Sequence, residues 1–511
     1  MIYFDNAATS LVKPPEVAQA VLRAMSELGN VGRGVHAASL GASMSVYECR
    51  CAVNDLLGGP DPARVAFGYN VTWALNVAIA GLLRPGERAV TTAASHNSVL
   101  RPLFRARDER GCVVDVAPHG TDSALDWDAY QELLAPDAQS CPVRLVVATH
   151  ASNLTGDVYD VARMAALAHE AGALFVLDAA QTAGAIPLDM AALGADIVCF
   201  TGHKSLLGPQ GTGGLIAAPA VEIPALLEGG TGIHSFDERQ PAGMPDSLEA
   251  GTLNAHGLAG LAAGVAYLQR TGVAEHAAYV ADLTKRFEEG ALACPGVVVY
   301  GGHAGVARTG VVALNIGDLD SAIVSARLSG DYGICTRPGA HCAPLMHKAL
   351  GTADRGVVRF SFSHFNTPEE IESGLTAISE ISHSLSRAAQ NRFSSAKRRE
   401  ATCTPDCPLL KAGSGLQGVR RRCVLDVREV SDTERPLRRA PRNAAHQVLP
   451  PAKSRFSFAR RREATCTGVL SPPGNAADEV LQLYFPDVDD VFLGEGAPRH
   501  RISVQRGVVE G

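Results

Sequence analysis

The sequence predicts an α/β fold built on a large, mainly parallel sheet. Over about the first 385 residues, short apolar segments alternate with Ala-rich segments of helical periodicity. The clearest succession is RLVVATH (144–150), VARMAALAHEAG (161–172), ALFVLDAAQ (173–181) and ADIVCFTGHK (195–204). Strands that are apolar along their whole length are typical of a parallel sheet with helices on both faces.

Composition limits the classes of function. The chain has 511 residues, 46% hydrophobic and 19% charged, which is ample for a large core. The net charge of -7 gives no reason to expect binding to nucleic acid or to a membrane. The chain opens on a short apolar strand and a turn (MIYFDNAATS), and no apolar run approaches the roughly 20 residues that cross a bilayer. Its 12 cysteines lack the spacing of a disulfide framework, which favours reduced thiols and a cytoplasmic protein.

The segment 386–511 has a different character. It is basic and poor in periodic apolar residues, and RFSSAKRREATCT (392–404) recurs as RFSFARRREATCT (455–467). We expect a disordered or poorly packed extension; binding of an anionic partner, a fusion and an altered reading frame remain alternatives. The pair of cysteines in CTPDC (403–407) has no second pair nearby, so we predict no metal site.

Polar residues follow two of the predicted strands. Asp178 and Lys204 each stand where an apolar run ends, and Gln181 comes three residues after the aspartate. Ligands of parallel sheets bind at these carboxyl ends. Lys204 could be a covalent anchor, a phosphate ligand or a solvated turn residue. Together with the carboxylate it suits pyridoxal phosphate (PLP), which needs an amine for its Schiff base and an acid at its pyridine nitrogen.

A phosphate site is also predicted. Thr72 in NVTWALN (70–76) lies near an expected helix start, where backbone N–H groups and the helix dipole favour an anion. Thr201 and His203, on either side of the lysine turn, can supply further donors.

An ordered set of motifs resembles one family. YFDNAAT, NVTWALN, SHNSVLRP, HASNLTG, LDAAQTAG, FTGHKSLLGPQGTG, EAGTLN, RPGAHCAP and VRFSFSHFNTPEEIE occur in its order. Residues 1 to about 382 resemble the class V aminotransferase fold type, specifically the cysteine desulfurase and selenocysteine lyase family, in its second, short-loop group. This implies a PLP-dependent transferase of fold type I. Its large domain would cover about 15–255, and a smaller α+β domain would cover about 256–385 plus the N-terminal segment.

The resemblance implies roles for the cofactor-binding residues. Lys204 would form the Schiff base, Asp178 would pair with the pyridine nitrogen and Gln181 would bind the phenolic oxygen. His96 would stack on the ring and carry protons, as an imidazole that titrates near neutral pH can. The remaining implied contacts are Asn153 beside the ring and substrate, Thr72, Thr201 and His203 on the phosphate, and Thr252 on the phosphate from the neighbouring subunit of a homodimer.

Two arginines and one cysteine would serve the substrate. Arg359 would bind its carboxylate, with Arg337 as a second candidate. Cys342 lies in a loop with glycine, proline and histidine (GICTRPGAHCAPLMH, 333–347), where a strained turn is expected. A cysteine is usually structural, but within RPGAHCAP this one is predicted to be the sulfur acceptor, and His341 or Arg337 could favour its thiolate.

The resulting prediction is a cysteine desulfurase. It would take sulfur from L-cysteine as a persulfide on Cys342, release L-alanine and pass the sulfur to an acceptor protein. One alternative is a selenocysteine lyase acting on L-selenocysteine, or another PLP-dependent lyase or aminotransferase of small amino acids. Another is a non-catalytic PLP-binding scaffold with a basic partner-binding tail. The motifs NVTWALN and NSVLRP depart from the family's usual Gly-Thr-Thr-Glu and Ala-Asn, which changes the expected phosphate site.

Overall fold

The computed structural model describes residues 1–401, except 33, 136–140 and 303–305. The second repeat copy and CTPDC therefore lie outside the described residues. The last described helix, α11 (Pro368–Ala401), continues past residue 385, where the sequence composition changes. None of the helices in the described ranges is long and apolar enough to cross a membrane.

A seven-stranded sheet forms the larger part, in the order β2-β8-β7-β6-β5-β3-β4. The strands from β7 to β4 are parallel, whereas β8 runs antiparallel to both its neighbours. The predicted α/β class with a mainly parallel sheet is confirmed. The strands are β2 (Val65–Gly68), β3 (Arg88–Thr92), β4 (Val113–Ala117), β5 (Val143–Thr149), β6 (Leu174–Asp178), β7 (Ile197–Thr201) and β8 (Gly213–Ala217).

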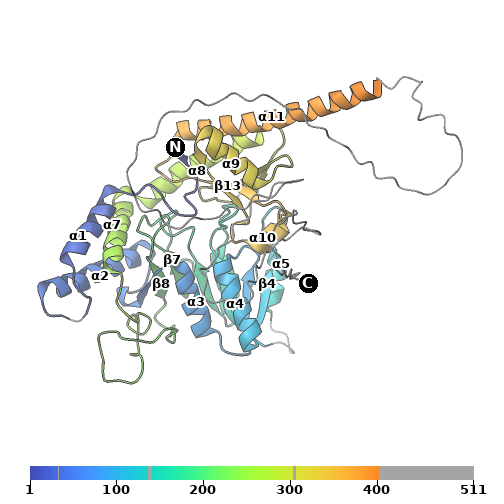
Figure 1. Ribbon diagram of the computed structural model, residues 1–511. Coiled ribbons are helices and arrows are strands. Elements are labelled where there is room, and N and C mark those ends of the chain that lie inside the picture. Colours follow the sequence, from blue (N-terminus) through green and yellow to red (C-terminus); the bar gives the residue numbers. More distant parts are fainter. Residues whose placement is uncertain (33, 136–140, 303–305, 402–511) are drawn as a thin grey trace, which may run out of the picture. The chain divides into compact units, whose positions relative to one another are not determined.

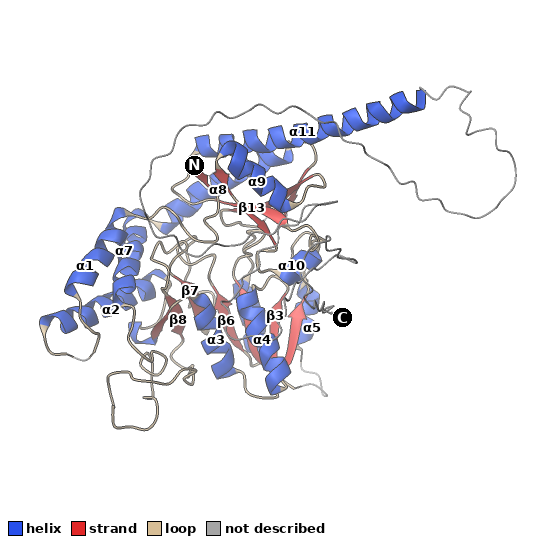
Figure 2. Ribbon diagram, in the orientation of Figure 1, coloured by secondary structure: helices blue, strands red, loops and turns tan. Residues whose placement is uncertain are grey.

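Helices cover both faces of this sheet (Figures 1 and 2). One face packs on α3 (Val71–Leu82) and α4 (Asn97–Arg110). The other shares a core with α2 (Ala37–Leu56), α5 (Trp127–Leu134), α6 (Val161–Glu170) and α7 (Ala255–Thr271). Strand residues alternate between the cores: Val176 belongs to the first, and Phe175 and Leu177 belong to the second.

The helix α7 belongs to the larger part. It packs on α1 (Pro15–Glu27) and α2, and its Leu258, Leu261 and Val265 lie in the core of the large sheet. The sequence places the start of the small domain at about residue 256, but the packing places its first helix at α8 (Val273–Leu292), whose Leu283 and Phe287 lie in a separate core.

A four-stranded antiparallel sheet forms the smaller part, in the order β12-β13-β10-β9. Figure 1 shows α8, α9 and α11 around β13. The N-terminal strand β1 pairs in parallel with β11, so the first residues join this part. Its elements are β1 (Ile2–Tyr3), β9 (Val297–Tyr300), β10 (Val311–Ile316), α9 (Ser321–Tyr332), β11 (Ile334–Cys335), β12 (Arg337–Gly339), α10 (Pro344–Ala349) and β13 (Val357–Ser361).

Candidate active site

A cavity of about 200 Å³ lies at the carboxyl ends of the central strands. Its lining includes every site residue predicted from the sequence except Cys342 and Thr252. The predicted residues that it brings together are Thr72, His96, Asn153, Asp178, Gln181, Thr201, His203, Lys204, Arg337 and Arg359.

Two neighbouring parallel strands position Asp178 and Lys204. Asp178 is the last residue of β6, and Lys204 lies in the turn after β7, which pairs with β6. Burial lowers the pKa of Lys204 to about 8, against the opposing effect of Asp178. Burial also raises the pKa of Asp178, although its Oδ1 accepts a hydrogen bond from the Ala180 N–H (3.0 Å). The site therefore holds an amine that is readily neutral and a carboxyl group that lacks water.

The start of α3 faces the same cavity. The N-cap Asn70 accepts a hydrogen bond from the Trp73 N–H (3.1 Å), and the first N–H groups of any helix lack intrahelical acceptors. Thr201 Oγ1 is buried without a hydrogen-bond partner among the described residues. Burial lowers the pKa of His203 to about 4, helped by Lys204 and Lys13. These donors suit an anion.

His96 is the N-cap of α4. Its Nδ1 accepts a hydrogen bond from the Ser98 N–H (3.0 Å) and lies 2.9 Å from Ser98 Oγ. Burial first, then Lys204, lowers the pKa of His96 to about 4, below the near-neutral value that the sequence suggests. A ring nitrogen that accepts from an N–H carries no proton, so the neutral ring carries its proton on Nε2.

Ser98 is a functional candidate that the sequence prediction missed. Its Oγ joins His96 to Thr72, since it lies 2.8 Å from Thr72 Oγ1. The sequence does contain a signal for this role. Ser98 is the second residue of a helix that begins after a histidine, and a side chain at that position can contact the N-cap residue. The unusual NSVLRP segment therefore supplies a link between His96 and Thr72.

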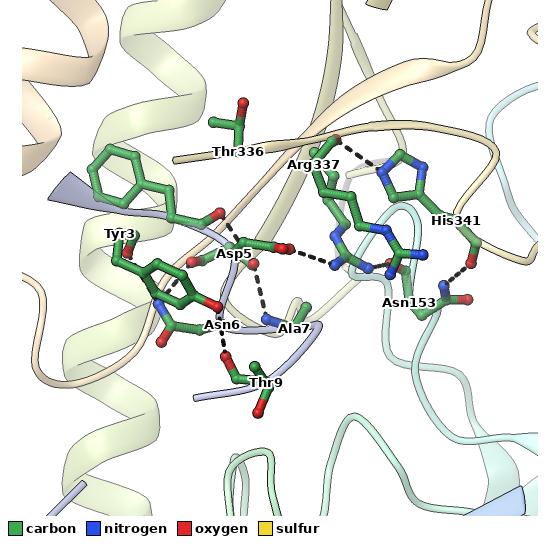
Figure 3. Close-up of polar contacts among 12 residues, drawn as sticks. Tyr3, Asp5, Asn6, Ala7, Thr9, Asn153, Thr336, Arg337 and His341 are labelled. Carbon is green, nitrogen blue, oxygen red and sulfur yellow. Dashed lines mark hydrogen bonds and ion pairs between the residues drawn. The ribbon is translucent and has the colours of Figure 1, made fainter. Parts of the chain in front are cut away.

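Two arginines, Arg337 and Arg359, also line the cavity. Arg359 is almost fully buried, donates to Asn153 O (2.9 Å) and forms an ion pair with Asp5 (2.9 Å). Figure 3 shows Asp5, on the N-terminal segment, facing the group that contains Asn153, Arg337 and His341. The sequence prediction missed Asp5, because its partner lies far along the chain.

Cys342 lies beside this group in a turn, half-buried. Its φ is 57° and that of His341 is 50°, both in the left-handed region that is unusual for residues with a side chain. The Asn97 N–H, next to His96, donates to the carbonyl of Cys342 (2.9 Å). Burial lowers the pKa of His341 to about 3, so Arg337 is the charged group of this loop and His341 is neutral.

Thr252 is exposed and does not line the cavity. Its expected contact with a phosphate involves a neighbouring subunit, so that contact stays a prediction.

The residues present fit PLP. Besides the lysine, the acid and the helix start, the buried atoms without hydrogen-bond partners in the described ranges include Thr201 Oγ1, Asn153 Oδ1 and Arg359 Nε. Buried polar atoms are normally hydrogen-bonded, so these atoms mark places for a polar ligand.

Comparisons with known proteins agree with this geometry. Residues 2–373 match the family described as Aminotransferase class-V. A probable cysteine desulfurase of Methanothermobacter thermautotrophicus is 34% identical, over 73% of this chain and 92% of that protein. The cysteine desulfurase CsdA of Escherichia coli is 29% identical, over 74% of this chain and 93% of its own. The apo structure of a cysteine desulfurase from Thermococcus onnurineus is 32% identical and superposes with a TM-score of 0.67, over 75% of this chain and 95% of that one.

Proposed function

The chain belongs to the class V aminotransferase family as a PLP-dependent cysteine desulfurase, and we propose that its cavity transfers the sulfur of L-cysteine to Cys342 and releases L-alanine. One observation carries the proposal: the strained Cys342 turn is hydrogen-bonded to the start of α4, whose N-cap His96 lines the cavity of Lys204. A lyase without a sulfur acceptor has no need of a thiol there.

We assign cofactor contacts to this chain's residues. Lys204 would hold PLP covalently, Asp178 would pair with its pyridine nitrogen and Gln181 would bind its phenolic oxygen, while His96 and Asn153 would lie beside the ring. Thr72, Thr201 and His203 would hold the phosphate. When bound, PLP supplies an electron sink that weakens bonds at the substrate's α-carbon.

The protein's own groups move the protons. The Lys204 amine, with its pKa at about 8, would accept the proton from the substrate's α-carbon. His96 donates its proton from Nε2, because its Nδ1 already accepts a hydrogen bond from the Ser98 N–H. Arg359 and Arg337 orient the substrate carboxylate.

Sulfur transfer completes the reaction. The Cys342 thiolate attacks the substrate sulfur, a sulfur–sulfur bond forms and the bond between that sulfur and the β-carbon breaks. Its electron pair stays on the carbon fragment, which is protonated and leaves as L-alanine. A persulfide remains on Cys342, and an acceptor protein or a small thiol removes the outer sulfur.

We also propose a cytoplasmic homodimer. Exposed apolar side chains gather on two helices: Leu22 and Met25 on α1, and Leu40, Met44 and Tyr47 on α2. Such surfaces are commonly buried against a partner. In the dimer, Thr252 would reach the phosphate of the neighbouring subunit. The eight described cysteines are free thiols, which suits a reducing compartment.

The test compares two cysteine variants of the PLP-loaded protein. Cys342→Ala should keep the visible absorption of bound PLP but lose release of sulfide and alanine from L-cysteine. Cys335→Ala, which removes another half-buried thiol of the same segment, should keep both. Full desulfuration by Cys342→Ala would refute the assignment and favour another lyase or aminotransferase reaction.

A further inference from the structure

Three polar side chains form a short chain of hydrogen bonds in the wall of the cavity. Thr72 Oγ1 lies 2.8 Å from Ser98 Oγ, and Ser98 Oγ lies 2.9 Å from Nδ1 of His96. All three residues line the cavity, and Ser98 is buried. The chain therefore joins a residue proposed for the phosphate to a residue proposed for the ring.

The number of protons in this chain sets the direction of its hydrogen bonds. Each hydroxyl group has one proton to donate, whereas Nδ1 of His96 has none, because it accepts the Ser98 N–H (3.0 Å). The Ser98 hydroxyl therefore donates to Nδ1, and the Thr72 hydroxyl donates to Ser98. This direction satisfies all three groups, but it turns the Thr72 proton toward Ser98 and leaves no hydroxyl proton for a ligand.

A phosphate bound by Thr72 requires the opposite direction. The charged phosphate oxygens accept hydrogen bonds, so the Thr72 hydroxyl must donate to the phosphate, and the proton between the two hydroxyl groups must then come from Ser98. The Ser98 proton leaves His96, and a lone pair of Ser98 Oγ faces the lone pair of Nδ1. A phosphate at this place thus removes one of the two hydrogen bonds that Nδ1 accepts.

The other groups around His96 do not replace this hydrogen bond. Besides burial, the largest cause, the positive charges that lower the pKa of His96 are those of Lys204, Arg337, Arg359 and Arg101, and the carboxyl group of Asp178 also lines the cavity. Among the described residues, the hydrogen bonds to Nδ1 come from Ser98, one from its N–H and one from its hydroxyl. The Ser98 hydroxyl is therefore the group through which a distant ligand can change this nitrogen.

We propose that Ser98 is a positioning residue that couples the phosphate to His96: phosphate on Thr72 turns the Ser98 hydroxyl away from Nδ1, so the imidazole becomes a better base only when the phosphate is in place. This inference rests on the proposed function, which assigns the phosphate to Thr72 and proton transfer to His96. Loss of one hydrogen bond of this kind raises the affinity of the ring for a proton by about tenfold. A site without phosphate therefore holds a poorer proton carrier.

The test compares PLP with pyridoxal, which has the same ring but lacks the phosphate. The full-length protein with isotope-labelled histidine is loaded with each compound, and the nitrogen NMR resonance of His96 Nδ1 is measured at neutral pH. A ring nitrogen that loses an accepted hydrogen bond moves downfield, so the wild-type resonance should lie further downfield with PLP than with pyridoxal. Ser98→Ala, which lacks the hydroxyl, should give the downfield position with both. Ser98→Thr keeps a hydroxyl and should restore the wild-type difference.

Ser95→Ala is the matched control. Ser95 is also buried and directly precedes His96, but its hydroxyl lies 2.8 Å from Thr91 Oγ1. This variant should keep the wild-type difference between PLP and pyridoxal. Equal Nδ1 resonances with the two compounds in the wild type would overturn the proposal, and so would a difference that persists in full in Ser98→Ala.

A second variant covers the case in which Ser98→Ala fails to fold. Thr72→Val removes the hydroxyl that competes for the Ser98 proton, so Nδ1 should keep its upfield position even with PLP, and a downfield position would contradict the proposal. None of these measurements requires sulfur release. A protein with the predicted resonances that does not desulfurate L-cysteine would refute the proposed function alone, and a desulfurase without them would refute only the coupling through Ser98.

Discussion

Lys204 is half-buried, and its surroundings favour the uncharged amine. Loss of water lowers its pKa to about 8, and Arg359 and Arg337 act in the same direction, whereas Asp178 and Asp5 oppose them. An amine attacks a carbonyl only in its neutral form. With a pKa of about 8, Lys204 has a much larger neutral fraction near physiological pH than an ordinary lysine, and that fraction is the reactive one.

The rate of PLP incorporation should show this directly. In protein stripped of PLP, the rate should rise with pH, level off above about pH 8 and fall about tenfold per pH unit below it, as the neutral fraction falls. Stopped-flow absorption measures this rate. Lys13→Gln is the control, because Lys13 also has a pKa lowered to about 8 by burial but lies outside the cavity lining. A midpoint near the ordinary lysine value would contradict the account.

The site residues differ in whether the nearby sequence is enough to predict them. Asp178 and Lys204 could be predicted because strand ends of a parallel sheet meet at one edge. Asp5 could not, since its role depends on a partner more than 350 residues away in the chain. The neutral state of His96 was also beyond the sequence, because burial decides its pKa.

At the scale of elements, the start of α3 depends on a close approach to β8. A Cβ on Gly213, the first residue of β8, would lie 2.7 Å from the Asn70 Cα, so this glycine lets the helix start sit against the strand. Asn70 then caps the helix and lines the cavity. Asn70 thus serves both helix stability and the proposed phosphate site.

Two substitutions at Asn70 should separate these roles. Asn70→Ala removes the cap and should cost about 1 kcal/mol in the free energy of unfolding. Asn70→Asp keeps a good cap but adds negative charge beside the phosphate, so it should preserve stability and weaken PLP binding by about tenfold or more. Thermal unfolding and equilibrium titration with PLP measure the two effects. Equal PLP affinity in Asn70→Asp and wild type would place the phosphate elsewhere.

The large sheet was predictable from sequence, but the small one was less so. The buried strands β5, β6 and β7 are continuous apolar runs, which the sequence shows directly. The pairing of β1 with β11 joins distant segments of two residues each, too short for any periodic signal. Placing α7 required knowing its packing on α1 and α2, since its own apolar pattern fits either part of the chain.

At the scale of the whole molecule, the exposed apolar surface of α1 and α2 predicts self-association. Leu22 and Met25 are 67% and 64% exposed. Apolar side chains at such exposure stabilise a folded chain only when a partner covers them. The expected contact of Thr252 with the phosphate of a neighbouring subunit also requires a second copy of the chain.

Leu22→Glu should therefore shift the protein from dimer to monomer in sedimentation velocity, and the monomer should bind PLP less tightly. The control is Ile323→Glu on α9, another half-exposed apolar residue on the smaller part. It should leave the sedimentation coefficient unchanged. A wild-type protein that sediments as a monomer while it holds PLP tightly would contradict the proposed dimer.

The most direct test of the central claim follows the sulfur atom itself. The PLP-loaded protein is mixed with a limiting amount of L-cysteine, its thiols are alkylated, and its peptides are analysed by mass spectrometry. We predict one additional sulfur on the peptide that contains Cys342, with an equal amount of L-alanine in solution. Alanine formed with the additional sulfur on another cysteine, or on none, would contradict the account.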